Sequence, residues 1–144
     1  MFPAGKKVLF LKRSGGQYEG EWWPVAGTSK VGEQPVQTAL RELHEETALK
    51  AEHLFDFGLE IPHLNNTKAL SAFVALVDKT SLVTLNFEHS QFRWMDGKEA
   101  LSSVPKKSEV YLEHLCKSFI DTSPIKDVEI YMGKETVGLM DLDL

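Results

Sequence analysis

The chain lacks the features that mark membrane-spanning and disulfide-stabilised proteins. Its 144 residues include one cysteine, Cys116, so no disulfide can form within the chain. Because Cys116 falls in an apolar-periodic stretch with Leu112 and Leu115, we expect a packed or half-buried thiol and not a nucleophile. No apolar run approaches the length of a bilayer span, and no charged-then-apolar leader opens the chain. We therefore expect a cytoplasmic protein without a membrane partner.

Positive charge is also scarce. The chain has 16 Lys and Arg residues against 21 Asp and Glu residues, which gives a net charge of −5. This balance disfavours a broad basic surface, so long nucleic acid is not an expected partner. Apolar residues at 42% and charged residues at 26% are typical of a globular protein, and the length fits one domain over 1–144. If such a protein handles phosphates, a bound divalent cation can supply the missing positive charge.

Strand-like and helix-like segments interleave along the chain, which predicts the α/β class. The segment 8–12 (VLFLK) is typical of a buried strand, and Pro35 suits the first turn of a helix. An amphipathic helix is predicted from there to about Leu49, with a buried stripe of Val36, Ala39, Leu40, Leu43 and Thr47. Further strands are expected at about 53–61, 70–77 and 92–95, helices at about 98–101 and 108–120, and a terminal hairpin over 128–139.

Three glutamates gather on the polar side of the predicted helix. Glu42, Glu45 and Glu46 stand at i, i+3 and i+4, so their carboxylates project from one side. Like charges at this spacing destabilise an isolated helix, and clustered oxygen ligands suit a hard cation such as Mg²⁺ or Mn²⁺. Taken alone, the three glutamates fit a solvated acidic face better than a metal site. Their sequence context is what favours the metal site.

The spacing around these glutamates resembles the Nudix box, G-x5-E-x7-R-E-U-x-E-E-x-G-U, in which U is an aliphatic residue. The match runs from Gly27 through Glu33 to the segment 41–49 (RELHEETAL). Eight of the nine defined positions agree, and Ala48 replaces the last glycine. If the helix ends there, we expect Ala48 to finish it without a left-handed conformation. The chain is thus identified as similar to the Nudix hydrolases.

The resemblance extends beyond the box, over about residues 6–120. VLFLKR at 8–13 is similar to a family strand, and Trp22 stands where many members have an aromatic residue. Glu88-His89 followed by Trp94 resembles a segment of nucleotide-cleaving members. The resemblance implies the Nudix fold, a mixed β-sheet between helices (α/β/α), in one domain. Residues 121–144 are expected to form a C-terminal extension, whose hairpin we expect to fill a sheet edge of its own subunit or of a partner.

The resemblance also implies roles for single residues. Glu42, Glu45 and Glu46 are expected to hold Mg²⁺, or Mn²⁺, and Glu45 counts as catalytic for that reason. Arg41 is expected to orient the carboxylates by bidentate pairing, with Glu33 as a candidate partner; the alternative is an ordinary surface ion pair. Gly27 would begin the loop that leads to the helix.

The general base and the substrate contacts are less constrained by the sequence. Glu88 is the leading candidate for the base that activates water, or for a further metal ligand, and Glu46 or Glu42 could serve instead. Trp22, Arg13 and His63 are expected substrate contacts, through ring stacking, phosphate binding and a loop contact. His44 and His89 carry less weight, and His44 is expected at the surface.

The predicted reaction is the Mg²⁺-dependent hydrolysis of a nucleoside or pterin triphosphate, which releases a monophosphate and pyrophosphate. Pro24-Val25-Ala26-Gly27 is similar to a segment of members that act on dihydroneopterin triphosphate and dATP. Alternative substrates are an ADP-sugar or a dinucleoside polyphosphate. A non-catalytic ligand sensor is another alternative, although a sensor normally lacks one or more box glutamates. The small phosphorylated substrate is the expected partner, and the chain is expected to be a monomer or a homodimer.

Overall fold

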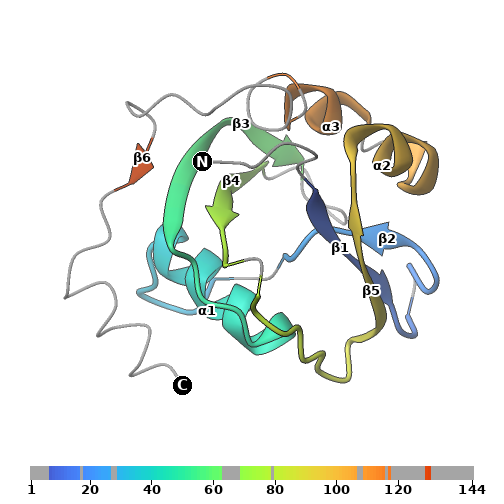
Figure 1. Cartoon of the computed structure of the whole chain (residues 1–144). Coiled ribbons are helices and arrows are strands. Elements are labelled where there is room, and N and C mark those ends of the chain that lie inside the picture. Colours follow the sequence, from blue (N-terminus) through green and yellow to red (C-terminus); the bar gives the residue numbers. More distant parts are fainter. Residues whose placement is uncertain are drawn as a thin grey trace.

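The computed structural model describes residues 7–16, 18–26, 29–62, 69–78, 80–106, 109–115, 117 and 129–130 (Figure 1). Three residues about which the sequence makes predictions lie outside these ranges: Gly27, His63 and Cys116. Most of the C-terminal extension also lies outside them. Within the described ranges, no helix is both long and apolar enough to cross a membrane.

The first sheet joins strands from distant parts of the chain. β1 (Val8–Arg13) lies between β2 (Trp22–Trp23) and β5 (His89–Met95), and both pairings are antiparallel. Successive β1 side chains point to opposite faces, and those of both faces are buried. The expected strand at 8–12 is confirmed, and the strand expected at 92–95 begins earlier, at its His89 end.

The second sheet has β3 (His53–Pro62) in the middle, with β4 (Ala69–Leu76) on one side and β6 (Glu129–Ile130) on the other. Both pairings are antiparallel, and β3 and β4 confirm the strands expected at these positions. β6 falls in the first arm of the expected terminal hairpin and pairs with Leu54 and Phe55 of β3. This arm therefore lies on a sheet edge of its own chain, and the second arm is outside the described residues.

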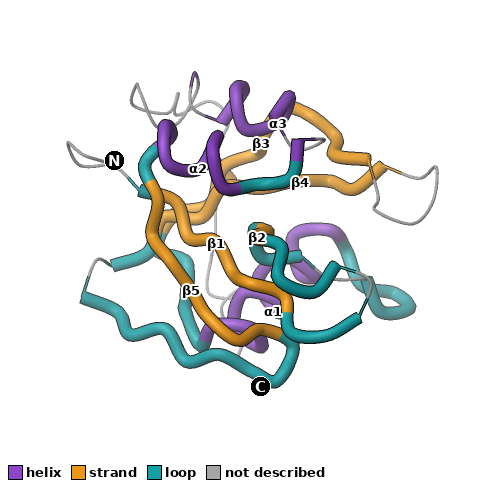
Figure 2. Tube along the Cα trace, turned by 90° about the vertical axis from the view of Figure 1, so that its right-hand side faces the viewer, coloured by secondary structure: helices purple, strands orange, loops and turns teal. Residues whose placement is uncertain are grey.

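Helices lie on two sides of the strands, which confirms the α/β class and the layered arrangement. α1 (Pro35–Thr47) lies on one side, while α2 (Gly97–Ser103) and α3 (Glu109–Leu115) lie together on the other (Figures 1 and 2). The described helices occur where the sequence predicts helices, and α3 covers the described part of the range expected for it. The face of the first sheet that points away from α1 packs against α2 and α3 in a cluster of Phe10, Phe55, Leu76, Met95, Ala100, Val104, Leu112 and Leu115.

α1 packs against both sheets, which fixes its orientation. Leu40 packs with Leu54 of β3, and Leu43 packs with Leu9 and Leu11 of β1. Phe10, between those two β1 residues, faces the opposite cluster. The face of β1 that carries its odd-numbered residues is therefore the face that meets α1.

The two ends of α1 are built differently. Pro35 occupies the first turn as expected, and the Gln34 N–H donates to Gln37 Oε1 over 2.9 Å. At the other end, Ala48 adopts a left-handed conformation with φ 63°, and its N–H donates to the His44 carbonyl over 2.8 Å. The expectation that Ala48 finishes the helix without this conformation is wrong. The chain keeps the backbone that a glycine would favour, although its Cβ makes that backbone costly.

Replacing Ala48 by glycine should stabilise the protein by about 0.5–1 kcal/mol, because glycine adopts the left-handed conformation without strain. Denaturant unfolding measures the change. As a matched control, Ala39→Gly makes the same substitution at a right-handed position inside α1 and should destabilise by about 1 kcal/mol. A loss of stability in both variants would contradict a strained C-cap.

Candidate active site

Arg41 is a buried cation on the polar side of α1. Its side chain is 3% exposed, and its Nε–H donates to Glu33 Oε2 over 2.8 Å. A second bond from Arg41 Nη2 reaches Glu33 Oε1 over 3.0 Å. The pair is therefore bidentate, as the sequence predicts. The alternative, an ordinary surface ion pair, is wrong because the guanidinium is buried.

The same guanidinium contacts two of the three predicted metal ligands. Arg41 Nη1 donates to Glu42 Oε1 and to Glu45 Oε2, each over 3.0 Å. The Glu42 side chain is 12% exposed, whereas that of Glu45 is 42% exposed. Each bond uses one oxygen of its carboxylate. Arg41 thus offsets the repulsion between the two glutamates and fixes where their carboxylates lie.

Glu33 is the carboxylate that anchors Arg41. It lies in the loop before α1 and accepts hydrogen bonds from the Lys30 N–H, the Thr38 hydroxyl and Arg41. The hydrogen bonds from Arg41 are the main cause that lowers the pKa of Glu33 from 4.5 to about 2, and burial opposes them. Glu33 is therefore ionised at neutral pH and ties the loop to the helix.

Replacing Glu33 by glutamine should destabilise the protein at neutral pH, and this loss should fade in acid. The folded-state pKa lies below the ordinary 4.5, so the stabilisation is complete above that pH and disappears as the pH falls toward 2. Denaturant unfolding at about pH 6 and about pH 3 measures the effect, with the exposed Glu19→Gln as the control. An equal loss at both pH values would contradict the ion pair as its source.

Glu46 is the most buried of the predicted metal ligands. Glu46 is 1% exposed, and neither of its carboxylate oxygens has a hydrogen-bond partner among the described residues. Burial is the main cause that raises the pKa of Glu46 from 4.5 to about 10. The carboxylates of Glu42 and Glu88 raise it further, and the charge of Arg13 lowers it. A buried carboxylate in these surroundings is stabilised by a cation.

Residues of β1 and β5 face Glu46. His89 is 5% exposed, and its Nδ1 lies 3.6 Å from Glu46 Oε1. Arg13 pairs with His89 across the sheet, and the Ser14 N–H donates to the Glu88 carbonyl over 2.9 Å. The structure therefore brings the predicted Arg13 and Glu88 close to the carboxylates of α1.

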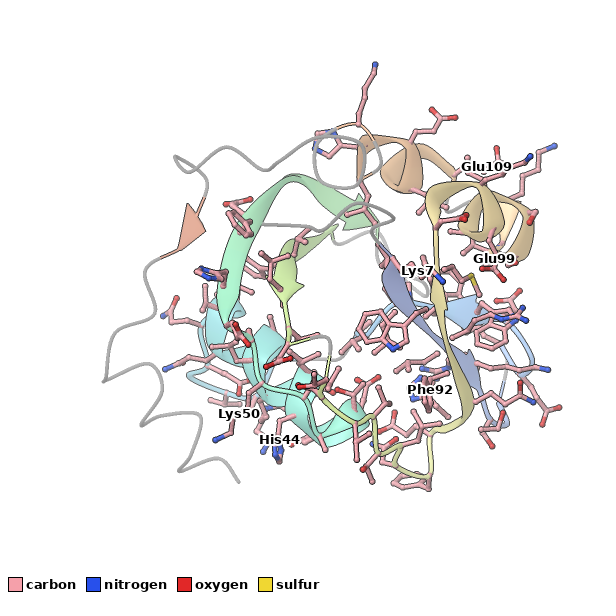
Figure 3. All side chains as sticks on the ribbon, viewed as in Figure 1. Lys7, His44, Lys50, Phe92, Glu99 and Glu109 are labelled. Atoms are coloured by element: carbon pink, nitrogen blue, oxygen red, sulfur yellow. The ribbon has the colours of Figure 1, made fainter. Side chains whose placement is uncertain are left out.

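His89 is the residue that sequence reasoning underweighted. Its signal was its place directly after Glu88, in the segment that resembles one found in nucleotide-cleaving members of the family. Burial and then the charge of Arg13 lower the pKa of His89, which favours the neutral imidazole. His44 lies on the side of α1 far from α2 and α3 (Figure 3), but it is half-buried and not fully exposed as a surface residue would be.

Trp22 lies on the other face of the first sheet. It pairs with Lys12 and packs against the cluster around Phe10, the face of β1 that points away from α1. The Lys12 Nζ lies 5.9 Å from the centroid of the Trp22 ring. The neighbouring Trp23 is buried at 8% exposure, whereas Trp22 is half-buried. Trp22 and Arg13 are therefore near in sequence but do not share a face.

The carboxylates of α1 suit a divalent cation by their chemistry. Glu46 offers two buried, unpartnered oxygens beside Glu42, and such oxygens are the ligands of hard cations. Within the described part of the chain, no three His, Cys, Asp or Glu side chains converge as a finished metal site. Glu42 and Glu45 turn toward Arg41, and the exposed side chain of Glu45 has room to rotate. By donor chemistry Glu42 and Glu46 are the candidates to hold an ion, while Glu45 is bonded to Arg41.

Comparison with known proteins agrees with this geometry. The sequence profile of the NUDIX domain matches residues 1–115. The asymmetrical bis(5'-nucleosyl)-tetraphosphatase of Mus musculus is 32% identical over 100 residues, which are 65% of this chain and 67% of that protein. An octanoyltransferase of Myxococcus xanthus is 32% identical over 106 residues, 69% of this chain, but this chain spans only 29% of its length.

Solved structures share the fold. The structure of a C. elegans Ap4A hydrolase matches with a TM-score of 0.65 and 24% identity, over 76% of this chain and 85% of that chain. The NUDIX domain of Shewanella oneidensis NrtR, complexed with ADP ribose, matches with a TM-score of 0.66 and 19% identity, over 77% of this chain and 76% of that chain. The box, the fold and the domain profile agree, and the chain belongs to the Nudix hydrolase family.

Proposed function

We propose that this Nudix hydrolase cleaves a diphosphate linkage in a nucleotide or related substrate with the help of a divalent cation. The observation that carries the proposal is the pair of unpartnered, buried oxygens of Glu46. They lie beside Glu42, on a helix whose remaining acidic residues are held by a buried arginine. A buried carboxylate destabilises the fold in apolar surroundings. A cation that also binds a substrate phosphate would stabilise it.

Glu42, Glu45 and Glu46 would hold Mg²⁺, with Mn²⁺ as the substitute. When bound, the cation neutralises the diphosphate and lowers the pKa of an attacking water. Arg41 keeps Glu42 and Glu45 in place through its shared Nη1, and it acts on the reaction only through them. Arg13, whose Nε–H is buried and without a hydrogen-bond partner among the described residues, is available to donate to a substrate phosphate.

Glu88 is the proposed general base for the attacking water. Its side chain is half-buried, and its carboxylate accepts a hydrogen bond of 3.4 Å from the Asn86 amide. The charge of Glu88 raises the pKa of Glu46, so the two carboxylates lie close to each other. A base there can accept the proton of the water while the α1 carboxylates hold the cation.

Two substrate classes are proposed, and they differ in their products. A nucleoside or pterin triphosphate, the first candidate, would yield a monophosphate and pyrophosphate. A dinucleoside polyphosphate is the second candidate, because the mouse relative that is 32% identical is named for that activity. Trp22 stays a candidate stacking surface for the base, although a base stacked there would lie on the face of the first sheet opposite the α1 carboxylates.

A substrate panel tests this proposal. Purified protein is incubated with Mg²⁺ and nucleoside triphosphates, dihydroneopterin triphosphate, ADP-sugars and dinucleoside polyphosphates, and the products are separated by chromatography. Pyrophosphate release supports the first candidate, and two unequal nucleotides from a tetraphosphate support the second. Hydrolysis of no diphosphate linkage in the panel, by protein that is folded and loaded with Mg²⁺, would contradict the proposed function.

A further inference from the structure

A β-bulge determines which way His89 faces. β1 and β5 pair regularly from Val8 opposite Met95 to Lys12 opposite Gln91, and the next pair is Arg13 opposite His89. One residue of β5, Ser90, is therefore extra. In a regular strand, with Ser90 opposite Arg13, alternation would place His89 on the same face as Gln91, which points away from α1. The bulge turns His89 to the face of Arg13 instead.

On that face, His89 meets the least solvated ligand of the proposed cation. The side chains of His89 and Glu46 are each 1% exposed, and 3.6 Å separates His89 Nδ1 from Glu46 Oε1. Neither atom has a hydrogen-bond partner among the described residues. Two complementary polar atoms that are buried face to face form a hydrogen bond after a shift of a few tenths of an ångström. They do so because a buried donor or acceptor without a hydrogen bond costs free energy.

We propose that His89 is a positioning residue, whose Nδ1–H holds the Glu46 carboxylate in the orientation that binds the cation. The inference rests on the proposed function. His89 binds neither cation nor substrate in this account, and its effect passes through Glu46. The imidazole would donate to one oxygen, Oε1, of a carboxylate that would hold the cation, and would thereby fix the orientation of that carboxylate. The other charged groups around the pair are Arg13, Glu42 and Glu88.

Mn²⁺ binding to the substrate-free protein tests the inference. Mn²⁺ affinity is measured by electron paramagnetic resonance for wild type, His89→Leu, His89→Gln and Gln91→Leu, and circular dichroism melting reports whether each variant is folded. His89→Leu should weaken Mn²⁺ binding by about 10–100-fold. His89→Gln keeps an N–H donor and should recover most of the affinity. Gln91→Leu changes an exposed residue of the same strand and should bind as wild type does.

Unchanged Mn²⁺ affinity in His89→Leu, or equal losses in His89→Leu and His89→Gln, would overturn the positioning role. Should His89→Leu fail to fold, His89→Phe, which also lacks a donor, takes its place: a loss of about 10-fold or more that His89→Gln does not show supports the role, and unchanged affinity overturns it. Glu46→Gln, measured in the same way, separates this inference from the function on which it rests. If Glu46→Gln binds Mn²⁺ normally, the cation site itself is wrong. If Glu46→Gln loses affinity while His89→Leu binds normally, the positioning role alone is wrong.

Discussion

Arg41→Met should lower the free energy of unfolding by about 3–5 kcal/mol, the expected cost of leaving buried carboxylates without their partner. The guanidinium is 3% exposed and is bonded to Glu33, Glu42 and Glu45. Methionine preserves much of the side-chain volume but removes every donor. Denaturant unfolding measures the change. Arg41→Lys, which keeps the charge and loses the bidentate geometry, should show a smaller loss and serves if Arg41→Met does not fold.

The chain contains a matched surface pair for comparison. Arg93 of β5 contacts Glu99 of α2 over 3.3 Å, and the two side chains are 58% and 37% exposed. Arg93→Met should therefore cost less than about 1 kcal/mol. If the Arg41 and Arg93 variants lose the same stability, burial does not set the strength of the Arg41 network.

Glu46→Gln should change activity and stability in opposite directions. It removes a charged cation ligand, so the rate of Mg²⁺-dependent hydrolysis should fall by more than about 100-fold, beyond the usual effect of residues that merely orient ligands. The variant should also unfold less easily than wild type in the absence of metal. The buried Glu46 must take up a proton to stay folded, which costs free energy above its ordinary pKa, whereas glutamine is neutral in both states.

The gain in stability should depend on pH. The folded-state pKa of Glu46, about 10, lies above the ordinary 4.5, so the metal-free wild type loses stability as the pH rises between these values. Glutamine does not titrate, and its advantage should therefore grow from about pH 5 to about pH 9. The exposed Glu52→Gln is the control and should show neither change. If Glu46→Gln hydrolyses substrate at the wild-type rate, Glu46 is not a ligand of the cation.

The sequence predicted the parts of the site that depend on local spacing. A helix starting at Pro35 follows from the proline and the apolar stripe, and that helix alone places Glu42, Glu45 and Glu46 on one side. The pairing of Arg41 with Glu33 was also predictable, because the two residues recur at fixed positions of the box. These features can be predicted from the helical repeat and the family pattern alone.

Other parts of the site depend on tertiary structure. The left-handed conformation of Ala48 is set by the chain turning back after α1, and alanine gives no sign of it. His89 faces Glu46 only because one extra residue in β5 shifts the pairing with β1, and simple alternation puts it on the wrong face. The burial of Glu46 likewise depends on how α1 packs against that sheet, which its charged neighbours in sequence do not reveal.

The central claim is that the carboxylates of α1 bind a divalent cation required for diphosphate hydrolysis. The most direct test titrates Mg²⁺ into EDTA-treated wild type and Glu46→Gln while hydrolysis of the best panel substrate is followed. The account predicts no hydrolysis without metal, saturable recovery in wild type, and recovery in Glu46→Gln only at much higher Mg²⁺ or not at all. Hydrolysis that persists in EDTA, or identical Mg²⁺ curves for the two proteins, would contradict it.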